Sequence, residues 1–178
     1  TGLPANTYSV TVTDAHGCSL IEAAVVTEPT VLAIATTPAV NVTCFGLNNG
    51  SSSVNAVGGT PPYTYLWNSS PVQTTAALVN VVAGNYMVLV SDSNGCTQTA
   101  NVQITEPPLL TANAANTNVS CFGLSDASAN VLAGGGVTPY NYAWSPIGGT
   151  NDIANNLPAD NYTVLVTDAN GCTQTATV

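Results

Sequence analysis

The stretch Tyr8–Cys18, YSVTVTDAHGC, returns as YMVLVSDSNGC at Tyr86–Cys96 and as YTVLVTDANGC at Tyr162–Cys172. Each copy alternates in polarity before a turn and a cysteine, which is typical of a β-hairpin. A second string, cysteine followed by Phe-Gly-Leu, begins at Cys44 and again at Cys121. Equivalent cysteines lie 76 to 78 residues apart, a period that suits a small all-β domain better than a solenoid turn. The chain is therefore a tandem array.

Two Thr-Glu-Pro strings, Thr27–Pro29 and Thr105–Pro107, punctuate equivalent places in the array. The last copy stops early, because Val178 aligns with Val102 and nothing after it matches the end of the previous copy. We therefore expect further repeats on both sides. The predicted division is 1–29 as the C-terminal part of one repeat, 30–106 as a complete repeat, and 107–178 as the following, nearly complete one.

The composition excludes several classes of partner. The chain has nine acidic residues, no lysine and no arginine, and a net charge of -9. Nucleic acid binding depends on cationic contacts to phosphate, and anionic membranes and phosphate ligands also need basic side chains, so we expect none of these partners. Apolar residues make up 45% of the chain, which predicts a folded protein. No run approaches the roughly 20 apolar residues of a membrane helix, so no membrane insertion is expected.

The apolar pattern of residues 30–106 is short, alternating and bounded by Gly, Pro and Asn, which predicts β-strands joined by tight turns and no helix. Seven strands of this length favour an all-β fold of tandem immunoglobulin-like β-sandwiches. The expected strands are Val31–Thr36, Val40–Cys44, Ser52–Val57, Tyr63–Asn68, Thr75–Asn80, Tyr86–Ser91 and Thr97–Ile104.

The five cysteines occupy repeat-locked positions and predict about one disulfide per repeat in an oxidising, extracellular setting. No Cys-x-x-Cys pair is present, so zinc is not expected. We favour pairing within each repeat, Cys44 with Cys96 and Cys121 with Cys172, which leaves Cys18 for a residue outside the chain. Two alternatives stay open. Neighbouring repeats could pair Cys18 with Cys44 and Cys96 with Cys121, or one bond could reach across a whole repeat, from Cys44 to Cys172.

Aromatic side chains alternate along one predicted strand of each repeat and should share one sheet face. We expect this stripe to fill the core, because each repeat has few other large side chains, and the rival interpretation is a sugar-stacking platform. A further tyrosine opens the strand before each of the three hairpins, at Tyr8, Tyr86 and Tyr162, in a place typical of a tyrosine corner. The predicted structural aromatics are Tyr63, Tyr65 and Trp67, Tyr140, Tyr142 and Trp144, and Tyr86 and Tyr162.

Polar residues at the turns and linkers offer little chemistry. His16, the only histidine, occupies a turn position that Asn94 and Asn170 fill in the other copies, so we interpret it as a turn residue. Without lysine, arginine, a triad or paired carboxylates, no enzyme is expected. No cofactor is expected either. Calcium is the one metal to consider, at Asp14, Asp92 and Asp168 of the hairpins and Glu28 and Glu106 of the linkers, but turn hydrogen bonding explains the aspartates better.

Three strings carry a family resemblance: Val42–Gly46, Gly58–Trp67 and Gly84–Cys96. Together they resemble the SprB-type repeats of Bacteroidota surface adhesins and, more weakly, PKD and immunoglobulin-like modules. The resemblance implies a β-sandwich array in an exported, filament-forming protein of the bacterial cell surface, secreted by the type IX route and linked in some members to gliding motility and adhesion. The third copy departs from the pattern at Gly134–Pro139, where the loop has one proline fewer than Gly58–Pro62.

These observations favour a non-enzymatic structural repeat region of an extracellular filament or adhesin stalk. Its expected partners are the neighbouring repeats and identical chains in a filament. A carbohydrate- or surface-binding module that acts through repeat avidity is the alternative. In that case the aromatic stripe or the Gly-Gly-Thr-Pro loops would contact a glycan or surface.

Overall fold

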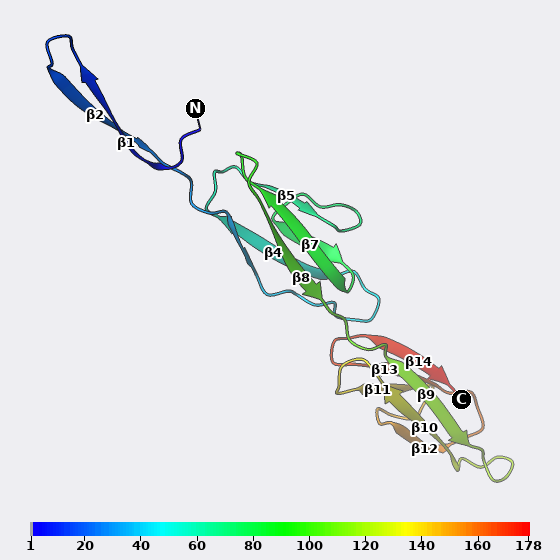
Figure 1. The fold of residues 1–178 in the computed structure, drawn as a ribbon. Coiled ribbons are helices and arrows are strands. Elements are labelled where there is room, and N and C mark those ends of the chain that lie inside the picture. The colour runs from blue at the N-terminus through cyan, green and yellow to red at the C-terminus, as the bar shows by residue number, and fades with distance from the viewer. Residues whose placement is uncertain (1) are drawn as a thin grey trace.

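The computed structural model describes residues 2–178, and every regular element in that range is a β-strand. The predicted all-β class is confirmed. Figure 1 shows the elements following one another from the N-terminus to the C-terminus along an elongated molecule. Residues 2–29 form the first segment, residues 30–106 the middle unit and residues 107–178 the third unit.

The middle unit consists of two three-stranded antiparallel sheets, in the orders β3-β4-β6 and β5-β7-β8. Side chains from both sheets meet in one core, where Trp67, Leu78, Val88 and Val90 are at most 1% exposed. Alternate residues point inward, as in β4, because side chains along a strand face opposite sides of the sheet. The strands are β3 (Ala33–Thr36), β4 (Gly50–Val57), β5 (Thr64–Trp67), β6 (Ala77–Val81), β7 (Gly84–Ser91) and β8 (Thr97–Ile104).

The third unit repeats this topology with sheets β12-β10-β9 and β11-β13-β14. Its core is separate and contains Trp144, Leu157, Val164 and Val166. Each unit therefore encloses its own apolar centre between two sheets. The strands are β9 (Thr111–Thr117), β10 (Ala127–Gly134), β11 (Asn141–Ser145), β12 (Ile153–Leu157), β13 (Thr163–Thr167) and β14 (Thr173–Thr177).

The first segment is a single hairpin of β1 (Asn6–Thr13) and β2 (Ser19–Val26), equivalent to β7 and β8. Val10 and Val12 take the positions of Val88 and Val90, yet they are 57% and 61% exposed. Among residues 2–178 no second sheet covers this hairpin, so its inward-type side chains face solvent.

The predicted strand Val40–Cys44 is wrong. Val40 makes only an isolated bridge to Ser51, and the backbone then leaves the sheet. The Val42 N–H donates to the Thr105 carbonyl at 2.9 Å, so this segment pairs with the start of the interunit linker. The unit has six strands rather than seven, and the lost strand is a loop that carries Cys44.

Candidate functional site: the junction between two units

The loop that carries Cys44 is held in shape by its own polar side chains. The Thr43 N–H donates to Asn49 Oδ1 at 3.1 Å, and Asn49 Nδ2 donates to Thr43 Oγ1 at 2.7 Å. A turn follows in which the Leu47 N–H donates to the Cys44 carbonyl. Val42, 3% exposed, anchors the loop in the middle core. The cysteine is thus presented at the end of the unit that faces the third unit.

The hairpin between β13 and β14 presents Cys172, and Asp168 organises its turn. Asp168 Oδ1 accepts hydrogen bonds from the backbone N–H groups of Asn170 at 2.9 Å and Cys172 at 2.8 Å, and Oδ2 accepts one from Val137 at 2.9 Å. Burial alone would raise the pKa of Asp168, but these backbone donors outweigh it and hold that pKa below its ordinary value. The carboxylate therefore serves the turn, as the sequence predicted for this position.

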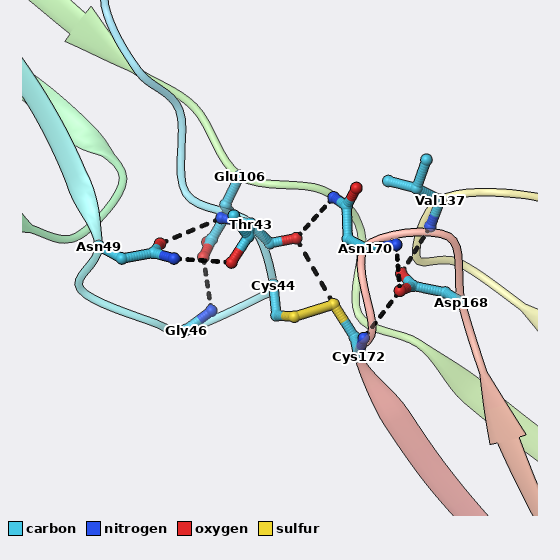
Figure 2. Close-up of a disulfide and its surroundings, with 9 residues drawn as sticks. All are labelled: Thr43, Cys44, Gly46, Asn49, Glu106, Val137, Asp168, Asn170 and Cys172. Carbon is cyan, nitrogen blue, oxygen red and sulfur yellow. Dashed lines mark hydrogen bonds between the residues drawn. A yellow bond between two sulfur atoms is a disulfide. The ribbon is translucent and has the colours of Figure 1, made fainter.

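The two cysteines meet across the junction. Cys44 and Cys172 form a disulfide with Cα atoms 5.7 Å apart and a sequence separation of 128. Beside it, Asn170 Nδ2 donates to the Thr43 carbonyl at 2.8 Å, so the hairpin of the third unit also hydrogen-bonds to the loop of the middle unit. Figure 2 shows loop and hairpin facing each other around the sulfur bridge.

The linker between the units is fixed at both ends. On the middle unit, the Glu106 carboxylate accepts a hydrogen bond from the Gly46 N–H at 2.6 Å, and the Thr105 N–H donates to Asn41 Oδ1 at 3.0 Å. On the third unit, the Gly136 N–H donates to the Pro108 carbonyl at 2.8 Å. Because the intervening Pro107-Pro108 pair also restricts φ, little of the linker is free to rotate.

The Gly-Gly loops, considered as binding loops in the alternative hypothesis, pack against the start of their own unit. Gly135 has φ +70°, and a Cβ there would lie 1.9 Å from the Leu109 carbonyl oxygen. A Cβ on Gly136 would lie 2.7 Å from Asp168 Oδ2. Gly58 and Gly59 contact Val31 and Asp92 in the same way in the middle unit. These glycines allow linker, loop and hairpin to approach closely.

The repeated segments around these loops identify the family. The SprB repeat profile matches residues 36–72 and 113–149. Both matches contain the loop cysteine and the aromatic strand, and they correspond position by position in the two units.

These segments are SprB repeats.

The solved structures that match do so weakly. One, on the structural basis for Dscam isoform specificity, has 12% identity and a TM-score of 0.36, and the match covers 97% of this chain and 53% of that one. Another, a 282-residue C-terminal fragment of intimin in complex with the intimin-binding domain of the translocated intimin receptor, has 16% identity and a TM-score of 0.35, covering 97% and 56%. This chain spans about half the length of those structures. No curated protein matches it.

The disulfide connects neighbouring SprB repeats, so the favoured pairing of Cys44 with Cys96 and of Cys121 with Cys172 is wrong. The pairing of Cys18 with Cys44 and Cys96 with Cys121 is also wrong, and the third alternative is the one observed. Cys18, Cys96 and Cys121 are exposed free thiols. The physical reason is the length of the sandwich. In the middle unit Cys44 follows the segment that pairs with Thr105 beyond the end of β8, whereas Cys96 directly precedes the start of β8, so the two lie at opposite ends of this strand. The loop cysteine of one repeat and the hairpin cysteine of the next meet at the junction instead.

The aromatic stripe of each SprB repeat lies on the core side of its sheet. Trp67 and Trp144 are 1% and 7% exposed. Their indole Nε1 groups donate to the carbonyls of Thr75 and Asn151, both at 2.9 Å. The four tyrosines of the stripe are half-buried and pack against the two cores; they are Tyr63, Tyr65, Tyr140 and Tyr142.

The tyrosine that opens each hairpin strand hydrogen-bonds to the carbonyl four residues before it. Tyr8 donates to Pro4 at 2.9 Å, Tyr86 to Val82 at 3.0 Å and Tyr162 to Pro158 at 2.9 Å. This is the corner geometry that the sequence predicted, and it fixes the loop before the strand.

Polar groups and a hollow also lie away from the junction. Across residues 2–178 no three His, Cys, Asp or Glu side chains gather into a metal-binding group, and no helix is long and apolar enough to cross a bilayer. A pocket of about 200 Å³ in the third unit is lined in part by Ala127 and Leu157. In the middle unit Ile104 fills this place, only 2.6 Å from where a Cβ on Gly50 would lie.

Proposed function

We propose that this chain is a structural stalk region of a surface adhesin or filament. Its function is to act as a spacer of limited flexibility between a surface and the distal part of the protein. SprB repeats belong to cell-surface proteins, so the chain is an adhesin-type repeat region. The non-enzymatic stalk function and the location outside the cell are our proposals. A disulfide between exposed elements suits an oxidising compartment.

The observation that carries this proposal is the covalent junction. Tandem domains joined only by a short linker bend at it by default, because interfaces inside one chain are usually small. Here the linker is hydrogen-bonded to both units, and a disulfide ties the loop of one to the hairpin of the next. Two separate attachments between rigid bodies oppose bending that a single flexible linker would allow.

The glycan-binding alternative has less support. Its platform would need exposed rings, since sugars stack on open aromatic faces, whereas the two tryptophans are buried and their N–H groups are already bonded. Its loops would need free surface, whereas the Gly-Gly pairs pack against the linker. If acrylamide quenched both tryptophans as efficiently as free indole, the alternative would gain support.

Distance measurements between two spin labels test the stalk. A Cys18→Ser chain keeps Cys96 and Cys121 as exposed free thiols, one on each unit, and both accept labels. The matched control adds Cys44→Ser and Cys172→Ser, which removes the disulfide and leaves the labels unchanged. We expect a single narrow distance distribution for the first chain and a broader one for the control. A broad distribution in both chains would contradict the proposal, because the junction would then not restrain bending.

A further inference from the structure

The three free cysteines occupy the same structural positions as the two that are bonded. Cys18 and Cys96 lie in hairpins equivalent to that of Cys172, and Cys121 lies in a loop equivalent to that of Cys44. Each of them could therefore form a disulfide of the kind that joins Cys44 and Cys172.

The two unpaired hairpins already have the geometry of the paired one. The Cys96 N–H donates to Asp92 Oδ1 at 2.8 Å and the Cys18 N–H to Asp14 Oδ1 at 2.9 Å, against 2.8 Å for Cys172 and Asp168. In each hairpin the backbone N–H of the turn aspartate also donates to the carbonyl of the cysteine, at 2.9 to 3.0 Å. The hairpin that forms a disulfide is therefore the same as the two that do not.

The unpaired loop is likewise preformed. The Ser120 N–H donates to Asp126 Oδ1 at 3.0 Å, as Thr43 does to Asn49, and the Leu124 N–H donates to the Cys121 carbonyl at 3.2 Å, as Leu47 does to Cys44. The adjacent phenylalanines differ. Phe45 is 51% exposed at the occupied junction, whereas Phe122 is 106% exposed. The loop of Cys121 thus presents an uncovered apolar ring where the equivalent ring is half covered.

We propose that Cys121 and Cys96 each form a disulfide with an adjacent copy of the SprB repeat. We call such a disulfide between neighbouring repeats a staple. The loop cysteine of every repeat bonds to the hairpin cysteine of the next, so Cys121 pairs with the hairpin of a following copy and Cys96 with the loop of a preceding one. The bonded pair Cys44–Cys172 in this chain is the observation that identifies the partner, because equivalent residues already make the bond.

The bond forms by thiol–disulfide exchange with a disulfide oxidant, either an oxidoreductase or a small-molecule disulfide. The loop thiolate attacks the oxidant and releases one thiolate, and the hairpin thiolate then attacks the mixed disulfide and releases the second. Each cysteine loses one proton and one electron, and the oxidant is reduced to two thiols. Both proposed cysteines are exposed and accessible to such an oxidant.

Continuous stapling changes how an array carries tension, a consequence that rests on the proposed stalk function. In an array with a staple at every junction, tension can pass from one staple to the next through a short stretch of backbone. This stretch runs from the hairpin cysteine of one repeat to the loop cysteine of the following repeat, as from Cys96 to Cys121. That route is only 25 residues long, the difference between these positions, and β8 and β9 already hold 15 of them in extended form. Fully stretched, it spans about 85 Å, so two repeats could lengthen little even if their sheets came apart.

An insertion variant tests the staple. One extra copy of residues 29–106 is placed after Glu106, so that a Thr-Glu-Pro string spans both new junctions as it does in the original chain. The chain is oxidised with a glutathione disulfide buffer, unfolded without reductant, alkylated and weighed intact. The insertion chain has seven cysteines, and two staples should leave three alkylated, as many as in the original chain.

Serine variants at one position in the two copies provide the matched control. Cys96→Ser in the inserted copy should free the Cys44 before it and give four alkylated thiols, whereas Cys96→Ser in the original copy should give two. Five alkylated thiols in the unsubstituted insertion chain, or two in the inserted-copy variant, would overturn the proposal. Narrow spin-label distances in the original chain would still support the stalk in that case, so the two failures are distinguishable.

Discussion

Cys44 of the middle unit and Cys172 of the third unit are bonded to each other, although 128 residues separate them and each has another cysteine nearer in sequence. The bond joins the end of one sandwich to the start of the next. The loop that it closes contains β4 to β8 of the middle unit, the linker, and β9 to β13 of the third unit. The two units are therefore covalently coupled twice, through the backbone and through sulfur.

Removing this bond should lower stability markedly. In the chain-entropy account, a cross-link that closes 128 residues contributes up to about 5 kcal/mol to the free energy of unfolding. We expect Cys172→Ser to lower the urea midpoint and to separate the unfolding of the two units into distinct transitions. Cys96→Ser is the control, because that thiol is exposed and unpaired in this chain. Equal midpoints for the two variants would show that the bond does not form in solution.

Close packing of the linker against the Gly-Gly loop should appear in a pair of alanine variants. Gly135→Ala and Gly149→Ala both put a side chain at positive φ, +70° and +83°, which costs about 1–2 kcal/mol. Only at Gly135 would the new Cβ clash with backbone, 1.9 Å from the Leu109 oxygen, while nothing lies within 4 Å at Gly149. Thermal unfolding should therefore show a clearly larger loss for Gly135→Ala. Similar losses would mean that the linker does not pack there.

Acid should weaken the hairpin turns. The Thr60 N–H is the main cause that lowers the pKa of Asp92, and backbone donors offset burial to lower the pKa of Asp168. A carboxyl whose folded pKa lies below its ordinary 3.8 adds stability above that pH, and the contribution is lost as pH falls through the folded value.

Urea unfolding between about pH 5 and pH 2 measures this effect. Asp168→Asn should be less stable than the parent chain at the upper pH, and the difference should shrink at the lower one. Asp152→Asn, at an exposed position, serves as the control and should keep the acid sensitivity of the parent. An Asp168→Asn deficit that stays constant over this range would exclude the carboxylate charge as the cause.

Local chemistry made parts of this structure predictable from sequence. The Asp-x-Asn-Gly turn, the tyrosine before it and the alternating tryptophan strand each depend on residues close in the chain, and the structure has them as expected. The strand expected at Val40–Cys44 failed because alternation alone does not reveal that Val42 bonds to Thr105, far along the chain.

The cysteine pairing was harder to predict, because it depends on which ends of two sandwiches meet. The spacing of the repeats gives the place of Cys44 and Cys172 in the sequence of each unit. It does not tell which end of one sandwich faces which end of the next. The loop residues Asn41 and Gly46 hydrogen-bond to the linker: Asn41 Oδ1 accepts from the Thr105 N–H, and the Gly46 N–H donates to Glu106. Their roles are visible only once the linker path is known.

Single-molecule stretching of the chain between its termini tests the stapled-stalk account most directly. With the disulfide intact, 178 residues less the 128 that it encloses leaves 50 that can extend, a gain in contour length of about 170 Å before folded dimensions are subtracted. After reduction, all 178 should extend to about 600 Å. Equal full-length extension under oxidising and reducing conditions would contradict the account, because tension would then unravel both units as if no bridge joined them.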